Sequence, residues 1–184
     1  MWNIFHKIYV ANISVFLISI PVLVLVWSVI GAAFYKWMRI IGAVLAVVAV
    51  GAIIYTTMIF RGESETGLYL VPFSSFERAE THSEMYRSML MNVFLFVPLG
   101  FTVPYVIGGG TVKKILLTIL IGFLLSATAE AVQYFAAIGM TETDDVICNT
   151  LGTAIVSCAY PISLLWRKLF NLFKDWLTHD DGAR

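Results

Sequence analysis

Two acidic side chains, Glu130 and Asp145, stand within or at the edge of long apolar stretches of this chain of 184 residues. A charged group in hydrocarbon costs at least a few kcal/mol, so it normally faces the interior of a helix bundle, where it has a partner or a task. Two neighbouring carboxylates can divide the roles of general acid and general base, or bind a divalent cation through oxygen ligands. The sequence leaves both chemistries open, with Glu130 and Asp145 as the catalytic candidates.

Histidine and cysteine offer no metal site of the zinc type. Cys148 and Cys158 lie ten residues apart in one predicted helix, which separates them by about 15 Å along the axis and excludes a disulfide between them. The three histidines are scattered, with no second ligand three or four residues away. No other motif identifies a cofactor, which therefore stays unknown.

The composition is that of a membrane protein. Hydrophobic residues make up 59% of the chain and charged residues 13%, and the mean hydropathy is +0.85, far from the values of soluble domains. The 12 basic and 12 acidic residues cancel, so no bulk charge indicates a nucleic-acid partner. The predicted partner is the lipid bilayer, and the oligomeric state is left open.

Five apolar runs are long enough to cross a hydrocarbon layer of roughly 30 Å as helices. They cover about residues 8–35, 40–60, 89–107, 115–137 and 144–166. The first run is too long for the apolar region of a signal peptide, so we interpret it as a retained span, with cleavage near "GAAF" as the alternative. The predicted fold class is all-α, a polytopic membrane bundle of about five transmembrane helices.

Lysines and arginines in short loops predict the orientation of the bundle. Four of them lie on one side, namely Lys7, Arg61, Arg78 and Arg87. The other eight lie on the opposite side, namely Lys36, Arg39, Lys113, Lys114, Arg167, Lys168, Lys174 and Arg184. The majority predicts an N-terminus outside and a C-terminus in the cytoplasm.

The chain divides into three predicted parts: residues 1–60 with two N-terminal spans, residues 61–166 with an outer loop and three spans, and a tail, residues 167–184. The "YLVPFSSF" at 69–76 in the outer loop is apolar, and Pro72 argues against a long helix there. It can fold back as a re-entrant or interfacial segment. The tail is either an amphipathic helix on the inner membrane surface or the frayed end of the fifth span.

Small and polar residues line one face of each of the last two predicted spans. At about 100° per residue, the face of the fourth span contains Thr118, Gly122, Ser126, Ala129, Glu130, Gln133 and Ala137. The face of the fifth contains Asp145, Asn149, Thr153, Val156 and Tyr160, with Gly152 at its flank and Asp144 pointing away. Together with Asn92 at the outer start of the third span, these faces predict a polar chamber that opens outward.

Two structural roles compete with that interpretation. Thr141 or Thr143 can cap the last helix, with Asp144 and Asp145 favoured in its first turn by the helix dipole. Glu130 and Asn149 can be polar contacts that hold helices together. Capping does not explain Glu130 or Asn149.

Four blocks of the sequence combine apolar residues with proline, glycine and polar side chains: "LVPFSSF" at 70–76, "MNVFLFVPLGF" at 91–101, "AEAVQYF" at 129–135 and "TETDDVICNTLGT" at 141–153. In order and spacing they resemble the VanZ-like family of bacterial membrane proteins. The positions that match the motifs are Pro72, Phe73, Asn92, Pro98, Gly100, Glu130, Gln133, Asp145, Asn149 and Gly152. Glu142 stands where an aspartate is expected, and no arginine stands just ahead of it.

The resemblance implies a protein of the bacterial plasma membrane with a link to resistance against teicoplanin-type lipoglycopeptides. Our first hypothesis is that the chamber binds a lipid or lipid-linked glycan of the envelope, with Asn92, Glu130, Gln133, Asp145, Asn149 and Phe73 as the ligand-binding residues. The second is a membrane enzyme that modifies such a substrate through Glu130 and Asp145. A transporter is less favoured, because no inverted repeat is visible.

Overall fold

The structure is a computed structural model, and it describes residues 2–59, 67–75, 83–137 and 139–181. Its helices are α1 (Trp2–Ala33), α2 (Met38–Ile54), α4 (Ser83–Val106), α5 (Thr111–Ala136), α6 (Thr143–Ser157) and α7 (Ala159–Asp181), with a π-helical turn η1 (Tyr55–Ile59) after α2. Two short strands, β1 (Gly67–Tyr69) and β2 (Met140–Glu142), complete the fold.

The helical elements confirm the predicted fold class. Four stretches of the described chain are long and apolar enough to cross a membrane, namely Met38–Met58, Met85–Val106, Thr111–Ala136 and Thr143–Leu177, and a shorter apolar helix covers Ile18–Ala33. Large apolar side chains such as Val47 and Phe135 point outward from these helices. The chain is a multi-pass membrane protein.

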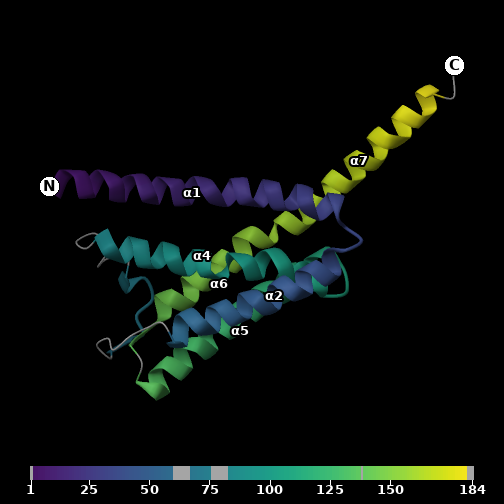
Figure 1. The fold of residues 1–184 in the computed structure, drawn as a ribbon. Coiled ribbons are helices and arrows are strands. Elements are labelled where there is room, and N and C mark those ends of the chain that lie inside the picture. Colours follow the sequence, from purple (N-terminus) through teal and green to yellow (C-terminus); the bar gives the residue numbers. More distant parts are fainter. Residues whose placement is uncertain (1, 60–66, 76–82, 138, 182–184) are drawn as a thin grey trace.

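The helix α4 lies at the centre of the bundle, in contact with α2, α5 and α6 (Figure 1). Its side chains Phe96 and Leu99 are fully buried. Two glycines allow α4 and α6 to approach closely. A Cβ added to Gly100 of α4 would lie 2.4 Å from the Thr153 backbone oxygen of α6, and a Cβ added to Gly152 of α6 would lie 2.0 Å from the Val93 backbone oxygen of α4. This contact fixes the second half of α6 against the middle of α4.

Two tryptophans attach α1 to the rest of the bundle. The Trp27 indole N–H donates to the Phe101 carbonyl oxygen of α4 at 3.0 Å. The Trp166 indole N–H of α7 donates to Ser28 Oγ of α1 at 3.1 Å. Helix α7 then continues past the bundle to Asp181 (Figure 1), so residues 167–181 extend the last span as one helix.

The strands β1 and β2 form a small parallel pair that sequence reasoning did not anticipate. Gly67, Leu68 and Tyr69 pair with Met140, Thr141 and Glu142, in that order. The pairing brings the described part of the segment between η1 and α4 against the start of α6. After β1 the chain turns at residues 71–73, and residues 74 and 75 are helical, so Pro72 lies in the turn that precedes them.

Candidate functional site

The buried faces of α5 and α6 are those that helical periodicity predicts. The buried residues of α5 are Thr118, Gly122, Ser126, Ala129, Glu130 and Gln133. Ala137 is the exception, because it is exposed and ends the helix in a left-handed conformation with φ of 53°. On α6 and the start of α7 the predicted face is buried as well, namely Asp145, Asn149, Gly152, Thr153, Val156 and Tyr160.

A pocket of about 440 Å³ lies where α4 and α6 begin and α5 ends. Its polar lining contains four of the predicted binding residues, Asn92, Glu130, Asp145 and Asn149, together with Thr56, Thr57 and Ser88. Met91 and Leu95 supply its apolar lining. We call this site the acceptor pocket, because two carboxylates and no cation line it among the described residues.

Hydrogen bonds hold both carboxylates of the acceptor pocket in place. The Asn92 side-chain amide donates to Asp145 Oδ1 at 2.5 Å, which joins α4 to α6. The Glu142 backbone N–H donates to Glu130 Oε2 at 2.9 Å, which joins the end of α5 to the start of α6. A hydrogen bond to a charged group contributes about 1.5–3 kcal/mol, so these contacts fix the positions of both acids.

Asn149 is only half satisfied. Its side-chain Nδ2 donates to Ser126 Oγ at 2.8 Å, a contact between α6 and α5. Its Oδ1 is buried and accepts no hydrogen bond from any part of the chain that the structure describes. A buried acceptor without a partner costs about 1–3 kcal/mol, and a ligand donor in the pocket would remove that cost.

Gln133 and Phe73 lie outside the lining of the acceptor pocket. The Gln133 side-chain amide is almost fully buried and donates to the Thr57 carbonyl oxygen at 2.9 Å. This hydrogen bond joins α5 to η1. The Phe73 side chain is 59% exposed. The structure thus brings four of the six predicted binding residues together.

The comparison with known protein families follows the same helices. A model of the VanZ/LLP1 family matches residues 40–166. The chain belongs to the VanZ/LLP1 family. The match extends from the start of α2 into α7, and so includes all the residues of the acceptor pocket. No curated protein and no solved structure matches the chain.

Asp144 holds the "LVPFSSF" block of this VanZ/LLP1 chain. Its side chain is buried, and its two oxygens accept hydrogen bonds from the backbone N–H groups of Phe73 at 2.6 Å and Ser75 at 2.7 Å. The Ser75 hydroxyl also donates to Glu142 Oε2 at 2.8 Å. Asp144 does point away from the polar face, as predicted, but the sequence did not indicate that it binds the backbone of Phe73 and Ser75.

The prediction that Thr141 or Thr143 caps α6 is wrong. Glu142, with extended backbone, occupies the N-cap position and makes no side-chain capping bond. The backbone of Thr141 belongs to β2. Its hydroxyl is buried, with no hydrogen-bond partner among the described residues. Asp144 and Asp145 do lie in the first turn, but each carboxylate has a partner elsewhere in the bundle.

No group of three or more histidine, cysteine, aspartate or glutamate side chains converges within the described residues. Both cysteines are free, which confirms that they do not pair. The acceptor pocket therefore offers carboxylate, amide and hydroxyl groups. These groups bind ligands through hydroxyl, amine or ammonium donors, and the two carboxylates can take or give a proton.

Proposed function

We propose that this VanZ/LLP1 chain is a bacterial plasma-membrane protein that binds a lipid or lipid-linked molecule of the cell envelope. The headgroup occupies the acceptor pocket and the acyl chains remain in the bilayer. The lysine and arginine count in the loops supports an orientation in which this pocket faces outward. In that orientation the pocket is reached from the outer leaflet.

The observation that carries the proposal is the unpaired Asn149 Oδ1 beside Glu130 and Asp145. Polar groups that only hold helices together find their partners within the bundle, as Gln133 does with Thr57. An acceptor left without one, in a pocket with two carboxylates, favours a ligand that brings several hydroxyl or amino groups. Sugar and amino headgroups have that chemistry.

The size and surroundings of the pocket support a headgroup as its occupant. Its volume of about 440 Å³ lies at the lower end of the range for small-molecule sites. The segment that Asp144 holds, residues 70–75, is called the anchored segment. It exposes the apolar side chains Leu70, Val71 and Phe73. Such side chains suit the acyl chains of a lipid that enters from the bilayer.

Mass spectrometry of lipids bound to the purified full-length chain tests the proposal. Asn149→Leu removes the unpaired acceptor and Asp145→Asn removes one charge, and we expect each to reduce the bound species about tenfold. Asp175→Asn makes the same change of charge on α7, outside the pocket, and should leave binding unchanged. Equal lipid recovery from all four proteins would contradict a binding role for the pocket.

A membrane enzyme is the second candidate, because Glu130 and Asp145 line one pocket and both are held in position. Envelope lipids from cells with wild type, Glu130→Gln or no protein distinguish the two functions. A lipid of altered mass that requires Glu130 indicates an enzyme. Unchanged lipid masses, with susceptibility to a teicoplanin-type lipoglycopeptide that depends on Glu130, indicate binding.

A further inference from the structure

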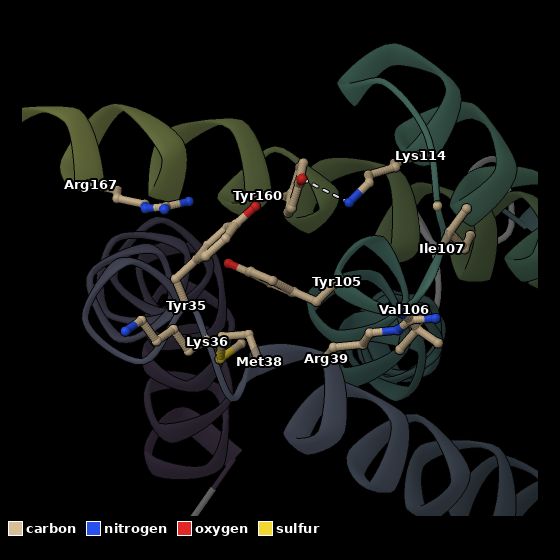
Figure 2. A pocket seen from close by; sticks show the side chains of 11 residues that line it. Tyr35, Lys36, Met38, Arg39, Tyr105, Val106, Ile107, Lys114, Tyr160 and Arg167 are labelled. Atoms are coloured by element: carbon tan, nitrogen blue, oxygen red, sulfur yellow. Dashed lines mark hydrogen bonds between the residues drawn. The ribbon is translucent and has the colours of Figure 1, made fainter.

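A second pocket, of about 490 Å³, lies at the opposite end of the bundle from the acceptor pocket. It is formed where α1 turns into α2, where α4 ends and α5 begins, and by the first turns of α7 (Figure 2). Its lining includes four cationic side chains, Lys36, Arg39, Lys114 and Arg167. We call it the basic pocket.

The electrostatics of the basic pocket are one-sided. No aspartate or glutamate is among its described lining residues. The first turns of α2 and α5 contain no acidic residue, and neither helix has a side-chain N-cap bond. Arg39 and Lys114 thus lie near the positive ends of two helix dipoles, where cations are disfavoured and an anion is favoured. A bound anion would relieve this repulsion.

Tyrosine rings hold two of the cations without using up their donors. The Lys114 ammonium donates to the Tyr160 hydroxyl at 2.8 Å, which leaves two of its three N–H groups for a ligand. The Arg167 guanidinium carbon lies 3.9 Å from the centre of the Tyr35 ring, a contact that uses none of the guanidinium N–H groups. Figure 2 shows Arg167 beside Tyr35 and Lys114 beside Tyr160, with the tyrosine rings between the two cations.

Tyr105 contributes its ring to the pocket. It is 7% exposed and lines the pocket, packed edge to face against Tyr160 with ring centres 5.1 Å apart. Its hydroxyl is buried against Gly31 of α1 and Ser163 of α7. The Tyr105 ring therefore positions Tyr160, whose hydroxyl accepts the Lys114 hydrogen bond.

We propose that the basic pocket binds a phosphate group. Ammonium and guanidinium donors from four side chains match the oxygens of a phosphate, and the two nearby positive helix ends favour its charge. In Figure 2 the exposed Lys36 and Arg39 extend in opposite directions below Tyr105, so each would contact a phosphate from a different side. The phosphate belongs to an anionic phospholipid or to a soluble phosphate compound, because basic pockets between transmembrane helices suit either source.

Binding of phosphatidylglycerol, phosphatidylcholine and inorganic phosphate to the purified full-length chain tests this assignment. We expect wild type to prefer phosphatidylglycerol to phosphatidylcholine, and the Lys114→Met/Arg167→Met double variant to bind phosphatidylglycerol at least about tenfold more weakly. The matched control is Lys113→Met/Lys168→Met, which removes two neighbouring cations outside the lining. It should change binding by no more than about twofold.

Two outcomes would overturn the proposal: equal weakening in both double variants, or equal binding of the two lipids. Arg39→Met adds a test that does not depend on packing, since Arg39 is exposed. It should weaken binding about threefold, and no change would also count against the site. Inorganic phosphate that binds as tightly as phosphatidylglycerol assigns a soluble source, whereas phosphatidylglycerol that binds much more tightly than inorganic phosphate assigns the headgroup.

Discussion

The two ends of this helix bundle have pockets of similar volume and opposite character. The acceptor pocket contains Glu130, Asp145 and Asn149, and the basic pocket contains cations from four separate segments. Their volumes, about 440 and 490 Å³, do not distinguish them. The difference therefore lies in charge, and a headgroup rich in donors and a phosphate would each fit only one end.

The two ends also stabilise their charged groups in different ways. Asp144 and Glu130 accept hydrogen bonds from the backbone N–H groups of Phe73, Ser75 and Glu142, so these acids fix the backbone around them. Lys114 and Arg167 rest on tyrosine rings, which leave donors available. At the first end the charges build the site, and at the second they remain available to a ligand.

The largest expected effect is on the contact between α4 and α6, from Gly152→Val. An added Cβ would lie 2.0 Å from the Val93 backbone oxygen, and a backbone atom cannot swing aside. We expect a loss of about 3 kcal/mol or more in the free energy of unfolding, at the upper end for overpacked cores. Unfolding by denaturant in detergent micelles measures it.

Gly51→Ala is the matched control for this substitution. Gly51 also lies within a helix, but an added Cβ would have no atom within 4 Å, so alanine should be neutral or stabilise α2 by about 0.5–1 kcal/mol. Gly152 lies one turn from Asn149 and against the neighbour of Asn92. Gly152→Val should therefore weaken lipid binding at the acceptor pocket more than phosphate binding at the basic pocket. Equal weakening at both pockets would show that the two ends are not separable.

A smaller effect is expected from Asp144→Asn at the acceptor end. An amide has one acceptor oxygen where the carboxylate has two, so the hydrogen bond to either Phe73 or Ser75 is lost. A local loss of about 1.5–3 kcal/mol corresponds to about tenfold or more in amide exchange at residues 73 and 75. Hydrogen exchange followed by mass spectrometry measures it.

Asp145→Asn tests whether this loosening is specific. It makes the same change one residue further along, but Asp145 contacts Asn92 on α4 and not the anchored segment. Exchange at residues 73 and 75 should stay at the wild-type rate. Faster exchange in both variants would mean that the helix start, and not the Asp144 contacts, holds the segment.

Helical periodicity accounts for the part of the site that could be predicted from sequence. The positions Ser126, Glu130 and Asn149 follow from about 100° per residue, because packing of apolar helices buries their small and polar faces. The resemblance to VanZ-like sequences marked Gly100 and Gly152, and the close approach of α4 to α6 supplies their physical reason.

What could not be predicted depends on contacts between segments that are distant in sequence. The partner of Asp144 lies about seventy residues earlier, and the β1–β2 pair that aligns the two segments is only three residues long. Lys36, Lys114 and Arg167 were assigned to one side of the membrane by their number in loops. A count of charges does not say that Tyr160 holds Lys114 and Tyr35 holds Arg167 at one pocket.

The smallest expected effect separates the two ends by salt. A rise in NaCl from about 0.05 M to about 0.5 M shortens the screening length from roughly 14 to 4 Å, so phosphatidylglycerol binding at the basic pocket should weaken about threefold, since Lys36, Arg39 and Arg167 are exposed. A neutral headgroup in the acceptor pocket, held by the buried Asn149 and Asp145, should bind equally at both concentrations. Titration of each lipid into the full-length chain measures both.

An acceptor pocket whose lipid binding weakens in parallel would show that its ligand is an ammonium ion, since screening acts on charges and not on neutral donors. A basic pocket that is insensitive to salt would instead show that Lys36 and Arg39 make no contact with the phosphate.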